Sequence, residues 1–395
     1  MHGRRFSARW FRLGLLAITF VAVLWLLPVR SQTLNRVSRT LVLQSTADSK
    51  QQAENDLQLG IALTARGSFA EAVPHFLAAK GRVSDEYALE FNLALCYIGA
   101  GEFRKAIPVL KVLRAGPHDG AAVENLLAQA YAGNGQAEEA FAALEQAAAF
   151  SPQDEKLYLF VADTFLGRQA EAQSLRVIEI GLEHLPKSAR LYYERGYLLS
   201  MLDDFDGARP DFEMAMRLAP HREIGYLAEA QENLLAGNLG EAIRVSRTAS
   251  AEGKQDYQLL AILGEALIRA GASPGQPEFA EARRTLEKSV AARPNYASSQ
   301  IALGHVDLLD GRLDAAVEHL ETGRRLSPRN PAVYPLLATA YRKSGRLDQG
   351  EAMLGILRKL NEEQAQRIRT APGDRKAIPG ASGAGPAGKK PPAEK

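Results

Sequence analysis

The chain has 395 residues, of which 46% are hydrophobic and 24% charged, a composition typical of a folded body with several domains or of a repeat array. A formal net charge of +2 gives no strong whole-molecule field, which excludes the charge signature of nucleic-acid binding. The single cysteine, Cys96, excludes an intramolecular disulfide, and its apolar neighbours favour a buried side chain over a reactive thiol.

The amino-terminal residues have the pattern of an export signal. Residues 1–12 carry four arginines and no acid, and residues 13–27 form an uncharged apolar run that ends at Pro28. This run is shorter than the ~20 residues with which a helix spans a bilayer. Two interpretations of residues 1–31 stay open: a signal peptide cleaved after Ser31, or an uncleaved signal anchor that associates with the membrane. Both predict export, with the body periplasmic or membrane-anchored outside the cytoplasm.

After a polar linker at residues 32–52, the sequence repeats itself. Pro152, Pro186 and Pro220 follow one another at intervals of thirty-four residues. Self-similarity at a period of about 20–50 residues is typical of stacked repeats. Nine units fit the period, and each contains two amphipathic runs that predict two helices, A and B. The units begin near Ala53, Tyr87, Ala121, Glu155, Ala189, Glu223, Tyr257, Ala297 and Pro331.

Glycine marks the turn between the two helices and predicts a residue in the left-handed conformation that ends helix A. The glycines are Gly67, Gly101, Gly135, Gly237, Gly271, Gly311 and Gly345. An apolar residue two positions later is expected to tuck the turn onto the core. These residues are Phe69, Phe103, Phe205, Leu239, Leu313 and Leu347. We expect Pro74, Pro108 and Pro210 in the first turn of helix B, where proline is tolerated.

Small residues occupy the eighth position of every unit and the twentieth of most, where a short side chain lets two helix axes approach. The unit from Ala189 shows the whole skeleton, with Gly196, Leu199, Ala208, Phe212, Ala215 and Pro220. This pattern resembles the tetratricopeptide repeat (TPR) family over residues 53–364. The resemblance implies an all-α, right-handed superhelical TPR solenoid of about nine helix-turn-helix repeats, with helix A on the concave face.

Several units depart from the pattern. Gln169 and Ser174 replace the usual glycine and alanine in the fourth unit, and Lys254 stands where proline is expected. Six extra residues around 272–277 lengthen one turn, and we interpret them as a tolerated insertion or as part of a binding surface. Pro335 is expected to delay the last helix A. Residues 365–395, rich in proline, glycine and lysine, are predicted to be a disordered tail.

The sequence shows no catalytic or cofactor motif. It lacks a phosphate-binding loop, a nucleophile elbow and paired metal-binding histidines, so we predict no enzyme activity, no cofactor and no metal site. The concave face is the better candidate for function. If the family geometry holds, positions 5, 9 and 12 of helix A, with position 2 beside them, form a stripe facing the groove. The candidate groove residues are Asn125, Gln129, Asp163, Arg190, Tyr193, Tyr197, Gln231, His305 and Arg342.

Tyrosine beside arginine suits a protein-binding surface, because both residue types dominate interaction hot spots. The alternative is that the tyrosines pack between neighbouring A helices. The sequence therefore favours a non-catalytic scaffold or adaptor in the cell envelope that binds a segment of a protein partner in the groove. A glycan-binding or enzyme-accessory module of the envelope is the other interpretation.

Overall fold

The structure, a computed structural model, describes residues 48–117 and 120–370, with side chains to residue 366. Within this part of the chain every regular element is an α-helix: a helix over residues 48–65, and then α2 to α18. They divide between two compact units, Met1–Leu218 and Ala219–Lys395. The predicted all-α class and the estimate of about nine helix pairs are confirmed.

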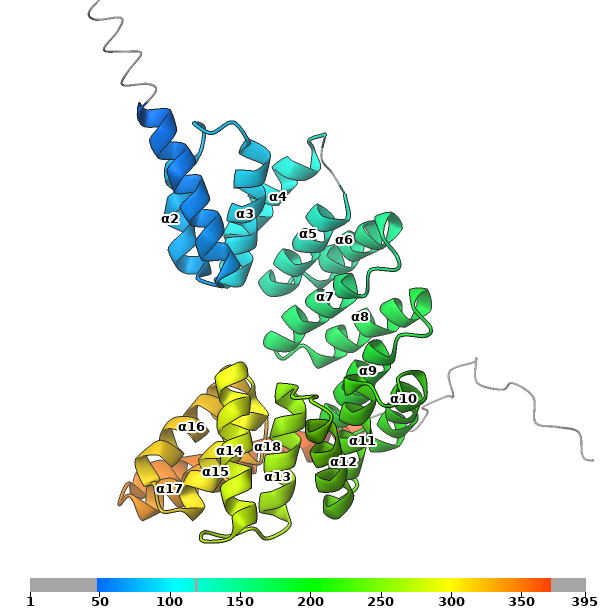
Figure 1. Ribbon diagram of the computed structural model, residues 1–395, viewed down its shortest axis with the longest axis vertical. Helices are drawn as coiled ribbons and strands as arrows, with labels where there is room; N and C mark the ends of the chain where they lie inside the picture. The colour runs from blue at the N-terminus through cyan, green and yellow to red at the C-terminus, as the bar shows by residue number, and fades with distance from the viewer. Residues whose placement is uncertain (1–47, 118–119, 371–395) are drawn as a thin grey trace, which may run out of the picture. The chain divides into compact units, whose positions relative to one another are not determined.

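The first unit holds five consecutive pairs, beginning with the helix over residues 48–65 and α2 (Figure 1). Its labelled helices are α2 (Phe69–Ala79), α3 (Glu86–Gly99), α4 (Phe103–Arg114), α5 (Ala121–Asn134), α6 (Ala137–Phe150), α7 (Glu155–Gly167), α8 (Glu171–His184), α9 (Ala189–Met201) and α10 (Phe205–Leu218). The second unit holds four pairs. Its helices are α11 (Glu223–Leu235), α12 (Leu239–Ala251), α13 (Tyr257–Arg269), α14 (Pro277–Ala292), α15 (Ala297–Leu309), α16 (Leu313–Leu326), α17 (Val333–Lys343) and α18 (Leu347–Thr370).

The A helices begin where the repeat period places them. Helices α5, α7, α9, α11, α13 and α15 each start at the first residue of a predicted unit. Side-chain caps fix several of these starts: Asp154 accepts a hydrogen bond from the Lys156 amide at 3.1 Å, and Ser188 from the Leu191 amide at 2.9 Å. Helix α17 begins at Val333, later in its repeat than the other A helices, which agrees with the effect expected of Pro335.

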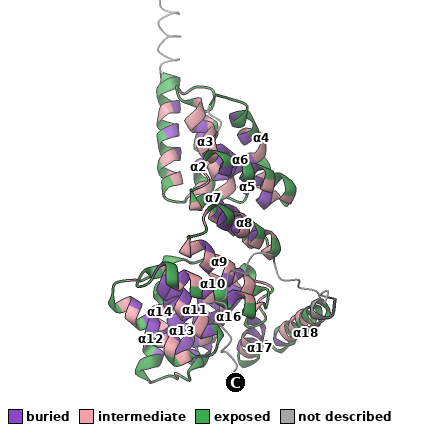
Figure 2. Cartoon of the chain, turned by 90° about the vertical axis from the view of Figure 1, so that its right-hand side faces the viewer, coloured by how far each residue is buried: buried purple, intermediate pink, exposed green. Residues whose placement is uncertain are grey.

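Helix packing follows the small residues at the eighth position. At Gly264 in α13, an added Cβ would lie 2.4 Å from Leu286 Cγ of α14. At Gly304 in α15, it would lie 2.6 Å from Leu320 Cγ of α16. Each helix also packs against the next one in the chain within its unit, and α5 packs against α7 as α13 packs against α15. The buried positions (purple in Figure 2) run along one side of B helices such as α12 and α16, as period-3.6 patterning predicts, whereas A helices such as α5 and α13 are buried over most of their surface.

The turn glycines have the predicted conformation. All seven have φ between 75° and 98°. Two repeats without glycine at this turn keep the same backbone conformation, since Gln169 has φ 59° and Asp203 has φ 62°. Left-handed backbone crowds the Cβ of a side chain, so these two residues are strained where glycine is not. The fourth and fifth repeats therefore keep the turn at a local energetic cost.

The prediction for the helix B prolines was wrong. Helices α2, α4 and α10 begin at Phe69, Phe103 and Phe205, so that their prolines lie one turn inside the helix. Each proline leaves the carbonyl four residues before it without its helical donor. Pro74, Pro108 and Pro210 are exposed, and so are the residues that carry these carbonyls, which places the freed oxygens within reach of water.

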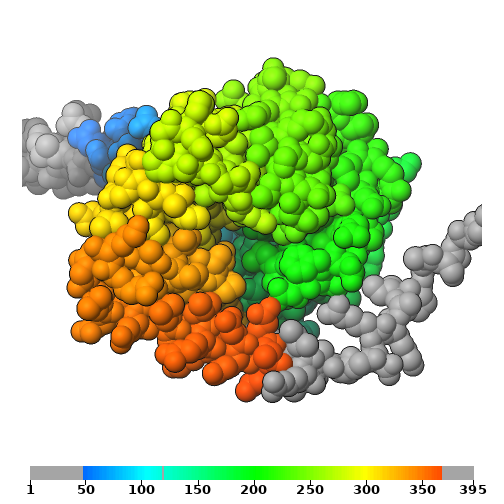
Figure 3. Space-filling model, turned by 90° about the horizontal axis from the view of Figure 1, so that it is seen from below, coloured from blue at the N-terminus to red at the C-terminus, as the bar shows by residue number. Residues whose placement is uncertain are grey.

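The apolar residue after each turn glycine is covered where another pair of the same unit follows. Phe69 and Phe103 are half-buried, as expected. Phe205 is 50% exposed and Leu347 is 60% exposed. These two begin α10 and α18, the last helix of each unit, and no later pair of the unit covers them. Helix α18 lies at the surface of the second unit (red in Figure 3).

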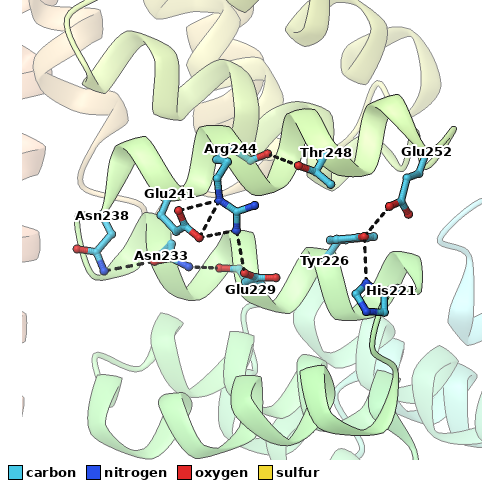
Figure 4. A network of polar contacts seen from close by, with 9 residues as sticks. All are labelled: His221, Tyr226, Glu229, Asn233, Asn238, Glu241, Arg244, Thr248 and Glu252. Atoms are coloured by element: carbon cyan, nitrogen blue, oxygen red, sulfur yellow. Dashed lines mark hydrogen bonds and ion pairs between the residues drawn. The ribbon is translucent and has the colours of Figure 1, made fainter.

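The departures from the repeat pattern are compensated locally. Ser174 is buried, and its hydroxyl donates to the Ala162 carbonyl at 2.9 Å. Without proline at Lys254, Gly253 ends α12 with φ 79°. Beside it the Tyr226 hydroxyl of α11 donates to Glu252 at 2.9 Å, in the polar network of Figure 4. The inserted residues form an exposed turn before α14, in which the Gln276 side chain accepts from the Ser273 amide at 2.9 Å.

The ends of the repeat body extend slightly past the boundaries expected from the sequence. Residues 48–52 are already helical, and α18 continues to Thr370 rather than stopping near residue 364. The predicted export segment at residues 1–31 and the tail from residue 371 lie outside the described residues. None of the helices within 48–117 and 120–370 combines the length and apolar character that a membrane crossing requires.

Candidate partner-binding face

The candidate site is built from the A helices of each unit. We call the side chains at positions 2, 5, 9 and 12 of these helices the A-face. Because these positions are separated by three or four residues, they lie on one side of each helix. The two units are considered separately: Asn125, Gln129, Asp163, Arg190, Tyr193 and Tyr197 belong to the first, and Gln231, His305 and Arg342 to the second.

Asn125 connects two neighbouring A helices. Its side-chain amide donates to the Leu157 carbonyl of α7 at 2.8 Å, and its own oxygen accepts from the Gln129 amide at 2.7 Å. Only 5% of Asn125 is exposed. A buried amide with both ends occupied holds the spacing of α5 and α7 rather than waiting for a ligand. Gln129 is half-buried and Asp163 is exposed, so both reach the surface of the face.

The two tyrosines of α9 differ in accessibility. Tyr193 is fully buried, at 0% exposure, and stacks on Tyr197 with ring centroids 6.3 Å apart. It also tilts against Phe212 of α10 at 5.9 Å. Tyr193 therefore packs α9 onto α10, the helix B of its own pair, whereas the packing alternative expected a contact between neighbouring A helices. Tyr197 is half-buried, and it presents the outer surface of this aromatic stack.

Arg190 lies over the same stack. Its guanidinium carbon is 5.7 Å from the centre of the Tyr193 ring, within the range of a cation–π interaction. Its Nη2 is also 2.6 Å from Glu194 Oε1, one turn along the helix. Two contacts on one side chain restrict its rotamers, so Arg190 is held in place at the surface.

Apolar side chains dominate the rest of the first unit's A-face. Phe91 and Leu95 of α3 and Leu159 and Leu166 of α7 are all half-buried and pack at the edge of the unit's core. Beside them Phe160 is 51% exposed. Sequence reasoning missed Phe160 because it occupies position 6, outside the expected stripe. The equivalent residue of α3 is Asn92. A large aromatic residue at this position in α7 is the signal that would have identified Phe160.

The second unit's predicted face residues differ in exposure. Gln231 is buried, at 7% exposure, His305 is half-buried and Arg342 is exposed. Burial lowers the pKa of His305, because the charged imidazolium is poorly solvated there. His305 is therefore neutral over most of the physiological pH range.

Glu265 was missed by sequence reasoning, although it stands at position 9 of α13, as His305 does on α15. Burial raises the pKa of Glu265, even though 37% of its side chain is accessible. Arg269 partly offsets this effect with Nη1 at 3.4 Å from Glu265 Oε1. Neighbouring groups desolvate this carboxylate but leave it accessible. Its interaction with an incoming cation or hydrogen-bond donor is therefore stronger than it would be in bulk water.

The described residues provide no evident catalytic or metal-binding arrangement. Among them no group of three or more histidine, cysteine or acidic side chains is placed to hold a metal ion. Cys96 is fully buried, and burial raises the pKa of its thiol. Its sulfur lies 3.0 Å from the Thr64 hydroxyl, so the thiol is packed rather than reactive.

Comparison with known proteins gives consistent results. Family models described as tetratricopeptide repeat match residues 57–120, 91–155 and 307–371. No curated protein matches the chain significantly.

Solved structures share the helical repeat at low identity. A chain of the APC/C hetero-tetramer Cut9–Hcn1 is 17% identical, with a TM-score of 0.46, over 76% of this chain and 58% of that one. The chain thus spans little more than half of that relative's length. A tetratricopeptide repeat protein from Parabacteroides merdae is 17% identical, with a TM-score of 0.40, over 73% and 99%. YrrB, a TPR protein described as having an unusual peptide-binding site, is 16% identical, with a TM-score of 0.30, over 49% and 97%.

Proposed function

Because the chain belongs to the tetratricopeptide repeat family, we propose that it is a non-catalytic adaptor whose first-unit A-face binds a segment of a partner protein. Stacked repeats of this kind are in general protein-interaction scaffolds, since each pair adds surface to a continuous binding face. The described residues form packed helices with accessible side chains, and no reactive cleft is evident among them. Binding would therefore depend on buried area and hydrogen bonds.

One observation carries the proposal. On the A-face of the first unit, apolar side chains remain half-buried, although each of them also packs against the core of the unit. Tyr197 supplies rigid aromatic area and Arg190 a positioned donor, and Phe160, which borders the A-face at position 6 of α7, adds an aromatic side chain that is 51% exposed. Aromatic residues and arginine contribute most of the free energy at interaction hot spots. Burying this face under a partner would remove apolar surface from water.

Burial supports a proposed division between framework residues and contact residues. Asn125 and Tyr193 are buried and hold helices together, so we assign them to the framework of the face. Gln129, Asp163 and Tyr197 remain accessible and are the proposed contacts of the first unit. A partner segment with apolar residues at regular spacing and polar groups near Gln129 and Asp163 fits this arrangement.

Binding can be tested with a displayed library of random peptides selected on the purified protein. Labelled peptides from the selection are then titrated against variants by fluorescence anisotropy. We expect Phe160→Ala to weaken binding by roughly tenfold or more, as for a hot-spot aromatic. Phe150→Ala is the matched control, since Phe150 is 54% exposed on helix B of the preceding pair. Equal effects of the two substitutions would contradict the proposal.

We further propose that the repeat body lies outside the cytoplasm, in the cell envelope. The support is the basic segment at residues 1–12 followed by the apolar run at residues 13–27. The intact mass of the protein purified from cells would distinguish cleavage after Ser31 from a retained anchor. Protease added to cells without their outer membrane should digest the body in either case. A body that stays protected until the inner membrane is lysed would contradict this location.

A further inference from the structure

Two neighbouring B helices of the first unit expose opposite charges. Helix α4 presents basic side chains, and α6 presents acidic ones, all at exposed positions. The basic strip consists of Arg104, Lys105, Lys111 and Arg114, and the acidic strip of Glu138, Glu139 and Glu145. Both helices pack against α5, which lies between them in the chain.

The two strips occupy equivalent positions of consecutive repeats. Arg104 and Glu138, Lys105 and Glu139, and Lys111 and Glu145 are each separated by thirty-four residues, the repeat period. Equal positions in successive repeats face the same way. The opposite charges therefore point outward together rather than toward each other.

Much of this charge is not neutralised within the unit. Lys105 pairs with Glu102 at 2.8 Å, and Arg114 lies 3.7 Å from Glu124. Among the described residues, Lys111 and Glu145 have no ion-pair partner within 4.0 Å. Lys111 lies instead over the Tyr131 ring, at 5.9 Å from its centre.

Apolar side chains accompany the strips. Val112 of α4 is 72% exposed, the largest value among the exposed large apolar side chains described, and Phe150 at the end of α6 is 54% exposed. Isolated exposed apolar residues are ordinary, but here they lie beside unneutralised charge on the same surface. A contact that covers the charges would bury them as well.

We propose that the protein forms a two-fold symmetric dimer through the α4–α6 surface, with the basic strip of one copy on the acidic strip of the other. A two-fold axis that runs between the strips along the helices sets α4 of each copy parallel to α6 of its partner, so that every contact occurs twice. An anionic membrane or nucleic acid would be attracted by α4 but repelled by Glu138, Glu139 and Glu145. A second copy is the partner that satisfies both strips. The inference is independent of the A-face and of the proposed function.

The test is sedimentation equilibrium of the purified protein over a concentration series at low and high salt. We expect a monomer–dimer equilibrium that shifts toward monomer as salt rises. Two charge-reversed proteins then probe the surface: Lys105→Glu with Lys111→Glu, and Glu139→Lys with Glu145→Lys. Each alone carries like charge on both strips and should self-associate at least about tenfold more weakly. Mixed together, the two should form a 1:1 heterodimer.

Controls separate this result from other causes. Glu183→Lys reverses an exposed charge on α8 of the same unit and should leave dimerisation unchanged. All substituted residues are exposed, so unchanged helical circular dichroism and melting temperature would show intact folding. A wild-type protein that stays monomeric at low salt, or charge-reversed proteins that fail to pair on mixing, would overturn the proposal. So would Lys111-dependent binding to phosphatidylglycerol vesicles by a purely monomeric protein, which would make the basic strip a membrane site.

Discussion

The Phe103 ring of α4 lies directly against Gly133 of α5, so closely that a Cβ on Gly133 would be 2.3 Å from a ring atom. The preceding repeat has the same contact, between Phe69 and Gly99, also at 2.3 Å. In the following repeat, alanine replaces the phenylalanine at Ala137, and a Cβ on Gly167 would meet nothing within 4 Å. In the repeats of Phe69 and Phe103, the ring after the turn therefore leaves room only for glycine at the end of the next A helix.

This contact predicts opposite effects for one substitution at two equivalent sites. Gly133→Ala should destabilise the protein by about 1–3 kcal/mol, because the new methyl group would overlap the Phe103 ring. Gly167→Ala should stabilise it slightly, because alanine favours helix and the space is open. Urea unfolding followed by circular dichroism measures both. A Phe103→Ala background should remove most of the penalty at Gly133, and a penalty that persists there would contradict the explanation.

The left-handed turn residues give a second prediction. Gln169→Gly should raise the free energy of unfolding by about 1 kcal/mol, since glycine adopts the observed φ of 59° without crowding its Cβ. The reverse change, Gly101→Gln, should lower it by a similar amount, because Gly101 has φ 75° and open space around it. Equal stability of all three proteins in urea titrations would argue against strain at these turns.

The sequence predicted most of the fold because a stacked repeat depends on local features. Turn glycines, capping residues and small residues at the eighth position act within one helix pair, and the thirty-four-residue period aligns them. The helix B prolines were predicted in the first turn because only their missing amide N–H was considered. The structure shows that exposure of the freed carbonyl, as opposite Pro74, permits proline a turn further in.

The candidate face was predicted only in part, because burial depends on neighbouring helices. Asn125 and Tyr197 lie in the same stripe of the sequence, yet one is buried and the other half-exposed. Nothing in the sequence of α5 shows that Asn125 reaches the Leu157 carbonyl of the next A helix. Such contacts join residues thirty or more positions apart, where a pattern within one helix gives no information.

Asp307 in the second unit is expected to be sensitive to the loss of one partner. It is fully buried, and its Oδ1 accepts from Arg283 at 2.7 Å, with Arg312 at 3.3 Å. Arg283→Met should destabilise the protein by about 3 kcal/mol, because the buried carboxylate would lose its main donor. Arg244→Met removes the exposed pair with Glu241 and should have little effect. Similar melting temperatures for the two variants would contradict this assignment.

The pH dependence of stability should include a contribution from His305. Burial lowers its pKa below the ordinary value of 6.5, so the folded protein binds this proton less readily than the unfolded chain. The imidazole is neutral in both states above that value and has no effect there. As the pH falls below 6.5, the unfolded chain gains protons first, and the free energy of unfolding decreases. His305→Gln should remove this decrease.

The measurement is the difference in unfolding free energy between wild type and His305→Gln at several pH values. Glu265 acts in the opposite direction, because its raised pKa adds stability as the pH falls toward its ordinary value of 4.5. That contribution is common to both proteins and cancels in the difference. A difference that does not change with pH would show that His305 titrates alike in the folded and unfolded states.

The most direct test of the partner-binding account is site-specific photo-crosslinking in living cells, with a photoreactive residue in place of Phe160 or, separately, Phe150. Both side chains are about half exposed, at 51% and 54%, but Phe160 lies on an A helix and Phe150 on a B helix. We predict a cross-linked product of one defined added mass from position 160 and none of that mass from position 150. The same product from both positions, or from position 150 alone, would contradict binding at the A-face.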